Sequence, residues 1–195
     1  MADPPTIDED RRRLSAWLWR LPVLLATGGA VYGVQLAYRV HFAKVAPADP
    51  PAFADAPPVE VAPLARFAAP WASEAFAVAG LPCMAVRVPE PVPGGTTVGR
   101  GDEAVHLVGF SRVCTHQHCI VDLNTDLELV AFAFNHRTDR PTLTCSCHYS
   151  VFDPLAAGRA VSGPAVRPLP RVRLREEATE GGGASIVADG LETVG

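Results

Sequence analysis

The sequence predicts a mainly β protein, in which a small antiparallel β domain follows one N-terminal helix able to cross a membrane. Short runs of β-forming residues alternate with turns, and one 18-residue run carries no charge. The 19 prolines and 16 glycines favour turns over long helices. Apolar residues at 48% can build a core, which excludes a disordered chain. The net charge of −4 gives no basic surface of the kind that binds nucleic acid.

The uncharged run is residues 21–38, LPVLLATGGAVYGVQLAY. At 1.5 Å per residue, a helix of this length extends about 27 Å, close to the hydrocarbon thickness of a bilayer. Trp17, Trp19 and Tyr38 flank the run, as interfacial aromatic residues do. We therefore expect residues 14–40 to form a transmembrane anchor or an uncleaved export signal. A buried helix of a soluble core is disfavoured, because no polar stripe interrupts the run.

Basic residues set the expected orientation of this helix. Arginines at 11–13 resemble a twin-arginine export signal, and residues 46–48, Ala-Pro-Ala, resemble a cleavage site. A cleaved signal peptide is therefore the alternative to the anchor. More basic residues precede the run than follow it, which predicts that residues 1–13 are cytoplasmic. Both interpretations place the rest of the chain on the extracytoplasmic side, and the anchor makes it a single-pass protein of the cell membrane.

Residues 41–60 are rich in alanine and proline and are predicted to be an extended tether, because proline blocks regular helix. Residues 61–195 are predicted to be the β domain. Its expected strands share a high content of β-forming residues: Glu74–Val78, Met84–Val88, His106–Phe110, Leu127–Phe134 and Ser185–Ala188. Turns are expected at residues 93–95, Pro-Gly-Gly, and 181–183, Gly-Gly-Gly.

Four of the five cysteines lie in two boxes with histidines, CTHQHC at residues 114–119 and CSCHYSVFD at residues 145–153. Each box offers a cysteine and a histidine two or three residues apart, plus a second cysteine. Structural zinc takes four such ligands around one ion, whereas a Rieske-type iron–sulfur centre takes two thiolates on one iron and two imidazoles on the other. The spacing C-x-H followed by C-x-x-H favours the second chemistry. Two surface disulfides with bystander histidines are the remaining interpretation.

The patterns C-T-H-x-x-C and C-x-C-H-x-S-x-F-D resemble the two boxes of Rieske iron–sulfur proteins of cytochrome bc and bf complexes. Residues 163–165, Gly-Pro-Ala, resemble the proline loop that covers the cluster in that family. The resemblance covers roughly residues 103–175. It implies a Rieske-type domain that binds one 2Fe–2S cluster, with cluster-binding loops around residues 112–121 and 143–170.

The resemblance also assigns roles to single residues. It implies four cluster ligands, two on each iron: Cys114 and Cys145 on the inner iron, His116 and His148 on the outer. It implies a disulfide between Cys119 and Cys147, and tuning of the cluster by Ser150 and Phe152. No separate catalytic side chain is expected.

Several positions depart from the family pattern. Gln117 and His118 stand where the family has leucine and glycine, and Tyr149 replaces a glycine. Phe152 stands where many members have tyrosine, so one hydroxyl donor to the cluster is missing. His118 is expected to be a neighbour of the ligands and not a ligand. Cys83 lies in an apolar stretch and is expected to be a buried free thiol.

The resemblance implies a membrane-anchored electron-transfer subunit of an oxidoreductase, the quinol-oxidising cytochrome bc-type complex. Its expected partners are cytochrome b and a c-type cytochrome, and its expected electron source is quinol. The alternative is the electron-transfer small subunit of an exported molybdenum oxidase such as arsenite oxidase, which Tyr149 and Phe152 favour. A soluble ferredoxin of an aromatic-ring oxygenase is disfavoured, since that group resembles boxes without Cys119 and Cys147.

Overall fold

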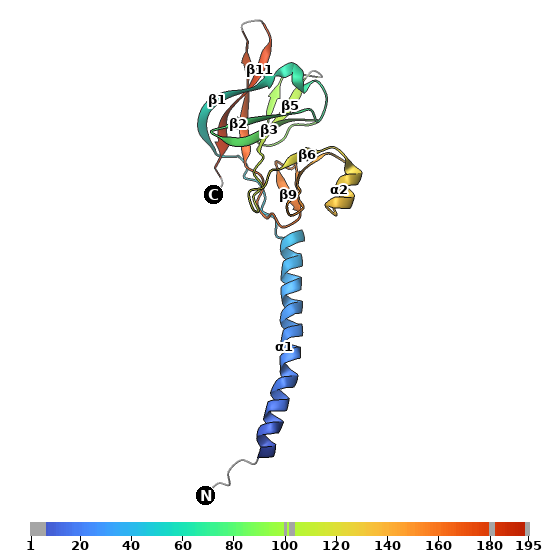
Figure 1. Cartoon of the computed structure of the whole chain (residues 1–195). Coiled ribbons are helices and arrows are strands. Elements are labelled where there is room, and N and C mark those ends of the chain that lie inside the picture. Colours follow the sequence, from blue (N-terminus) through green and yellow to red (C-terminus); the bar gives the residue numbers. More distant parts are fainter. Residues whose placement is uncertain (1–6, 100, 102–103, 180–181, 194–195) are drawn as a thin grey trace. The chain divides into compact units, whose positions relative to one another are not determined.

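The computed structural model describes residues 7–99, 101, 104–179 and 182–193 (Figure 1). The chain divides into two compact units, Met1–Arg39 and Val40–Gly195. The first unit consists of most of helix α1. We call the second unit the head, and each unit is described by itself.

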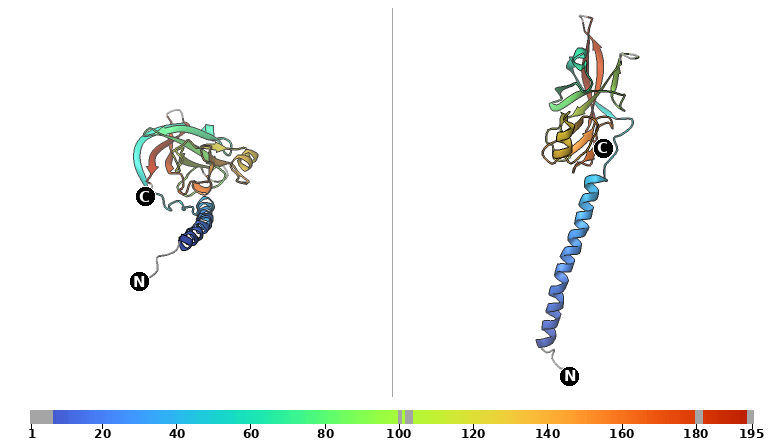
Figure 2. Two further views of the ribbon diagram at one scale, coloured as in Figure 1. Left: turned by 60° about the horizontal axis from the view of Figure 1, so that its bottom comes forward. Right: turned by 90° about the vertical axis from the view of Figure 1, so that its right-hand side faces the viewer.

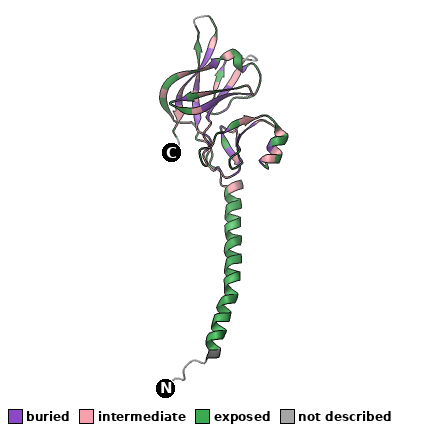
Figure 3. Ribbon diagram, in the orientation of Figure 1, coloured by how far each residue is buried: buried purple, intermediate pink, exposed green. Residues whose placement is uncertain are grey.

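Helix α1 runs from Ile7 to His41 and contains Pro22. Its stretch Glu9–Val40 is long and apolar enough to cross a membrane. Its described side chains are exposed almost throughout, whereas buried residues gather in the sheets of the head (Figure 3). The predicted helix of membrane-spanning length is therefore confirmed, and it extends beyond residues 14–40 at both ends.

The head contains two antiparallel sheets among its described residues (Figure 2). The larger sheet has the strand order β1-β11-β10-β5-β3-β2, with β4 paired to β5. Its strands are β1 (Phe53–Pro63), β2 (Ser73–Val78), β3 (Leu81–Val88), β4 (Thr96–Val98), β5 (Val105–Ser111), β10 (Arg171–Ala178) and β11 (Ala184–Glu192), with a short 3-10 helix at Leu64–Phe67. Four of the five predicted strands fall within β2, β3, β5 and β11, which confirms a mainly β antiparallel fold.

The smaller sheet has the order β6-β7-β8-β9 and carries both cysteine–histidine boxes at or near its strand ends. Its elements are β6 (Asp122–Asn124), helix α2 (Leu127–Ala133), β7 (Thr142–Cys145), β8 (Ser150–Asp153) and β9 (Arg159–Ser162). This sheet lies beside one end of the larger sheet (Figure 2). Apolar residues from both sheets join in one core, among them Val108, Phe110, Leu143 and Phe152. This shared core fixes the smaller sheet on the larger one.

The prediction of a strand at Leu127–Phe134 is wrong, because Leu127–Ala133 forms helix α2. Asp126 caps the helix, since its side chain accepts a hydrogen bond of 3.0 Å from the Leu129 N–H. Leucine, glutamate and alanine favour helix, and here their preference outweighs the β preference of valine and phenylalanine. Val130 is the residue of α2 that is fully buried.

The Ala/Pro-rich segment predicted as a tether at residues 41–60 ends in β1, which starts at Phe53. The strand pairs with β11 from Phe53 opposite Glu192 to Pro63 opposite Ser185. The pairing is interrupted between Asp55 and Val59, where two prolines fall, and β1 is an edge strand that tolerates them. The predicted start of the domain at residue 61 therefore lies inside β1, so the sheet takes up part of the predicted tether.

The turn expected at residues 93–95 is present, with Gly94 at φ +77° and the Gly95 N–H bonded to the Val92 carbonyl. Of the turn expected at 181–183, residue 181 lies outside the described residues. Cys83 is free and fully buried, as predicted.

Candidate metal centre

The first box forms a tight turn, which we call loop 1 (residues 114–119). The Cys114 N–H donates to the Cys119 carbonyl at 2.8 Å, and the His118 N–H donates to the Cys114 carbonyl at 2.9 Å. His118 lies in the left-handed region at φ +59°. These local hydrogen bonds bring the two ends of the box together and turn His118 outward, where it is exposed.

The second box contains loop 2 (residues 145–150), which connects β7 to β8. Cys145 and Ser150 are paired across the two strands, so the loop is a hairpin. Tyr149 has φ +59°, the same value as His118. Each loop therefore places a left-handed residue four positions after its first cysteine. The left-handed backbone is kept at both positions although neither residue is glycine, at a strain of roughly 1–2 kcal/mol each.

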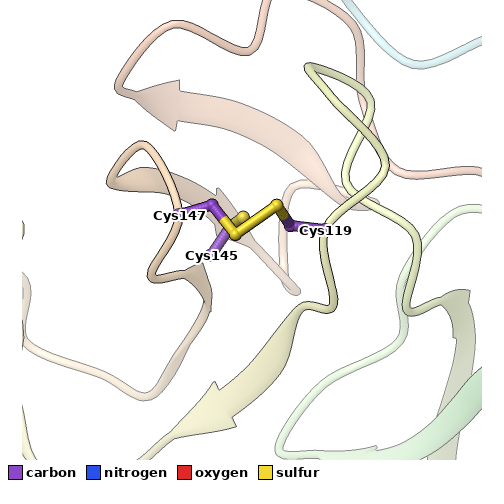
Figure 4. A group of neighbouring side chains, drawn as sticks. All are labelled: Cys119, Cys145 and Cys147. Atoms are coloured by element: carbon purple, nitrogen blue, oxygen red, sulfur yellow. A yellow bond between two sulfur atoms is a disulfide. The ribbon is translucent and has the colours of Figure 1, made fainter.

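A disulfide between Cys119 and Cys147 joins the two loops, with Cα atoms 6.4 Å apart (Figure 4). The Cys145 sulfur lies within 4.8 Å of both disulfide sulfurs. Sulfurs in a disulfide do not supply thiolates to a metal. Of these three cysteines, only Cys145 therefore remains able to bind one.

Two buried thiols lie on the inner side of the loops. Cys114 and Cys145 are free and each is 1% exposed. Burial raises the pKa of the Cys114 thiol; the His116 N–H, donating to its sulfur, lowers that pKa, and the adjacent Cys145 side chain raises it. Metal binding displaces such thiol protons, so this pair forms a two-thiolate site once a metal is bound.

Two imidazoles lie on the outer side. The His116 and His148 rings pack edge to face with centroids 4.9 Å apart. The Nδ1 atom of His116 is buried and has no hydrogen-bond partner among the described residues. Burial lowers the pKa of His116, and the adjacent His148 lowers it further. A neutral imidazole with an unpartnered nitrogen is the form that binds a metal.

A third segment, loop 3 (residues 163–166), covers loop 2. The Ala165 N–H donates to the Ser150 Oγ at 3.1 Å, which leaves the hydroxyl proton for a different acceptor. Gly163 has φ +79°, and a Cβ there would lie 2.4 Å from the Tyr149 carbonyl oxygen. Loop 3 can therefore approach loop 2 this closely only with glycine at position 163.

Phe152 is fully buried and belongs to the same core cluster as Cys114 and Cys145. The structure thus brings the four predicted ligands close to the predicted disulfide and to Ser150 and Phe152, whereas Gln117 and His118 are exposed.

Two residues beside the site were not predicted from the sequence. The Phe134 ring packs against the Tyr149 ring with centroids 5.8 Å apart, and Lys44 donates to carbonyls of loop 3. The one available signal was that Lys44 is the only lysine in the chain.

The donor set fits the predicted group. Two thiols on the inner side and two imidazoles on the outer side, one of them with an orphaned buried nitrogen, match the mixed ligation of a Rieske centre. Residues 94–173 match the family model of the Rieske [2Fe-2S] domain. The chain therefore carries a Rieske domain, and this domain binds a 2Fe–2S cluster.

The curated proteins similar to this chain include two that are named Rieske subunits. It is 35% identical over 75 residues to the cytochrome bc1 complex Rieske iron-sulfur subunit of Corynebacterium glutamicum, which is 37% of this chain and 15% of that protein. It is 35% identical over 63 residues to a putative respiratory nitrate reductase subunit Rieske of Haloferax mediterranei, which is 32% of this chain and 22% of that protein. The matches therefore span less than a quarter of either relative.

The solved structures similar to this chain include those of a Rieske protein and of a ferredoxin. The soluble domain of Rieske protein II from Sulfolobus acidocaldarius has a TM-score of 0.47 and 25% identity, over 69% of this chain and 78% of that chain. The ferredoxin of carbazole 1,9a-dioxygenase from Nocardioides aromaticivorans has a TM-score of 0.36 and 22% identity, over 66% of this chain and 95% of that chain.

Proposed function

We propose that the head is a one-electron carrier whose cluster is held by Cys114 and Cys145 on one iron and by His116 and His148 on the other. The bound cluster supplies one-electron transfer, at a potential raised by its two neutral ligands. The observation that carries this assignment is the unpartnered, buried Nδ1 of His116, whose ring packs edge to face with His148 in loops that also hold two buried free thiols.

The burial of the four residues suits electron exchange only on the histidine side of the site. Burial keeps water away from Cys114 and Cys145, whereas the His148 side chain is exposed. With Nδ1 of His116 turned inward, its Nε2 is the nitrogen left to exchange a proton with a partner or substrate. The exposed imidazole edge is therefore the face at which a donor or acceptor docks.

We place this carrier in the membrane, as the anchored subunit of a quinol-oxidising cytochrome bc-type complex. It accepts an electron from quinol beside cytochrome b and passes the electron to a c-type cytochrome. The length and apolarity of α1 support the anchor, and the bc1 relative supports the complex. The Cys119–Cys147 disulfide requires an oxidising compartment, which supports an extracytoplasmic head.

A second candidate is the electron-transfer small subunit of an exported molybdenum oxidase, such as arsenite oxidase. Phe152 brings no hydroxyl to the cluster, and one relative carries the name of a nitrate reductase subunit. Such a subunit delivers electrons without oxidising quinol.

Purification of the tagged full chain from detergent-solubilised membranes separates the two candidates. We expect cytochrome b and a c-type cytochrome to copurify, and added quinol to reduce the c-type haem. The matched His148→Ala complex should retain the cytochromes and lose this reduction. Copurification of a molybdenum subunit without cytochrome b contradicts the first candidate and supports the second.

A further inference from the structure

The segment of the head that follows α1 is hydrogen-bonded to loop 3 and to the larger sheet. We call residues 44–52 the strap. At its start, the Lys44 Nζ donates to the Gly163 carbonyl at 2.5 Å and to the Ala165 carbonyl at 2.7 Å. The Val45 N–H donates to the Val166 carbonyl at 2.9 Å. All three acceptors belong to loop 3.

The far end of the strap is held by the larger sheet. Arg171 is fully buried, pairs with Glu192 at 2.6 Å, and donates to the Ala48 carbonyl at 2.5 Å. The Thr193 N–H donates to the Ala52 carbonyl at 2.9 Å. The strap is therefore attached at both ends, although its sequence predicts an extended tether.

Loop 3 connects the strap to the metal centre. On one side its carbonyls at Gly163 and Ala165 accept from Lys44. On the other side its Ala165 N–H donates to Ser150, and its Gly163 lies against the Tyr149 backbone. Lys44 is half-buried, and burial lowers the pKa of its amine. Taking an amine out of water is unfavourable unless acceptors compensate, so the two carbonyls determine where this side chain lies.

We propose that Lys44 is a positioning residue that fastens the tether to loop 3 and thereby holds loop 3 against Ser150. Fastening also limits how far the chain between α1 and the larger sheet can extend. With the strap attached, only Phe42 and Ala43 lie between the end of α1 and Lys44, a span of roughly 11 Å. With the strap released as far as Phe53, the free chain can reach about 40 Å. The Lys44 side chain then couples the distance that the head can move to the contacts of loop 3.

This proposal rests on the proposed function only for the position of the cluster beside Ser150. A lysine-specific protease tests it on the cluster-loaded full chain in detergent, since the chain has a single lysine and is cut only after Lys44. We expect slow cleavage of the wild-type chain. Gly163→Ala displaces loop 3 and should speed cleavage about tenfold.

Gly80→Ala is the matched control, because Gly80 also has a positive φ of +81° but nothing within 4 Å of an added Cβ. It should be cut at the wild-type rate. Wild-type cleavage as fast as that of Gly163→Ala, with both chains loaded with iron, overturns the proposal. Loss of iron from the wild-type chain would instead contradict the proposed function, so the two failures are distinguishable.

A second pair of variants keeps the test decisive if Gly163→Ala does not fold. Lys44→Met removes the donors and keeps an unbranched side chain, whereas Lys44→Arg keeps donors. Deuterium exchange of peptides that cover loop 3 should be about tenfold faster in Lys44→Met and close to wild type in Lys44→Arg. The reduced EPR spectrum should change in Lys44→Met alone. Identical exchange and spectra in all three chains overturn the proposal.

Discussion

Loop 1 and loop 2 share one backbone plan but differ in what supports them. Each starts with a buried cysteine and reaches a residue with φ +59° four positions later. Apart from its disulfide and ring contact with loop 2, loop 1 is closed by its own backbone hydrogen bonds and by a hydrogen bond of 2.8 Å from the Thr115 hydroxyl to the Arg167 carbonyl. Loop 2 is held by loop 3, through Ser150 and Gly163, and by the ring of Phe134, the C-cap residue of α2.

The two loops therefore reach the same ligand geometry in two ways. In loop 1 a local turn places the imidazole, so the position of the ring depends mostly on the six residues of the turn. In loop 2 the placement depends on residues up to 15 positions away along the chain, as with Tyr149 and Phe134. Substitutions that disturb these supports should therefore act unequally on the two loops, while substitutions of the ligands should act equally.

The largest expected effect is equal in the two loops. His116→Ala and His148→Ala should each abolish cluster binding, because each leaves the outer iron with one imidazole. His118→Ala, in the same turn as His116, should retain the cluster since His118 points outward. Iron and sulfide per chain, with the visible absorbance, provide the measurement. Loss of the cluster in the His118 variant, with retention in the His116 variant, would reverse the ligand assignment.

The disulfide is shared, so its two ends should be equivalent. Cys119→Ser and Cys147→Ser each open a bridge with a sequence separation of 28 residues. In the chain-entropy model, this costs about 3.5 kcal/mol of the free energy of unfolding. Denaturation followed by cluster absorbance should show the same shift in midpoint for both variants. The double variant should be no worse than either; an additive loss would mean that the two sulfurs act separately.

Substitution of Phe152, which follows loop 2 in β8, should tune the cluster. Phe152→Tyr offers a hydroxyl donor beside Cys114, and the hydrogen bond is stronger when reduction makes the cluster more negative. A difference of about 1 kcal/mol between redox states corresponds to a rise of roughly 40 mV in a one-electron potential. Ser150→Ala removes a donor and should lower the potential by a similar or larger amount.

Voltammetry of the full chain measures this shift. Phe132→Tyr is the control, since Phe132 is 91% exposed on α2 and its added hydroxyl should leave the potential unchanged. An unchanged or lower potential in Phe152→Tyr, with the cluster intact, means that the new hydroxyl does not reach the sulfur.

The smallest expected effect separates the two left-handed residues. His118→Gly relieves strain but adds chain entropy in the unfolded state, and these terms nearly cancel at about 1 kcal/mol each. Tyr149→Gly has the same balance and also loses the ring contact with Phe134, worth roughly 0.5–1.5 kcal/mol. Unfolding of the cluster-loaded chain should therefore show Tyr149→Gly to be less stable than His118→Gly. Equal stabilities would remove the distinction between the loops.

Features that depend on residues close together in the sequence could be predicted, whereas features that depend on distant residues could not. The strands of the larger sheet were predictable because β-forming residues mark a half-buried sheet locally. The boxes were predictable because ligand spacing is itself local. Helix α2 was not, since its β-forming Phe132 lies exposed and the Asp126 cap decided the element. Lys44 was not, because its acceptors lie about 120 residues further along the chain.

The left-handed conformation at His118 and Tyr149 was also outside the reach of residue preference. Non-glycine residues favour right-handed and extended backbone, so each residue taken alone predicts a different loop. Only the closure of each turn around its cysteine imposes the positive φ.

The most direct test of a Rieske centre held by the two loops is pulsed EPR of the reduced full chain made with ¹⁵N-labelled histidine. Ligation by His116 and His148 predicts an iron–sulfur signal with nitrogen couplings from two histidine rings, one from each loop. One coupling should be assignable to His116 through its inward Nδ1. The His118→Ala chain should give the same couplings. A reduced cluster without ¹⁵N coupling, or a chain that is EPR-silent and holds stoichiometric zinc, would contradict the assignment of the two loops as a Rieske centre.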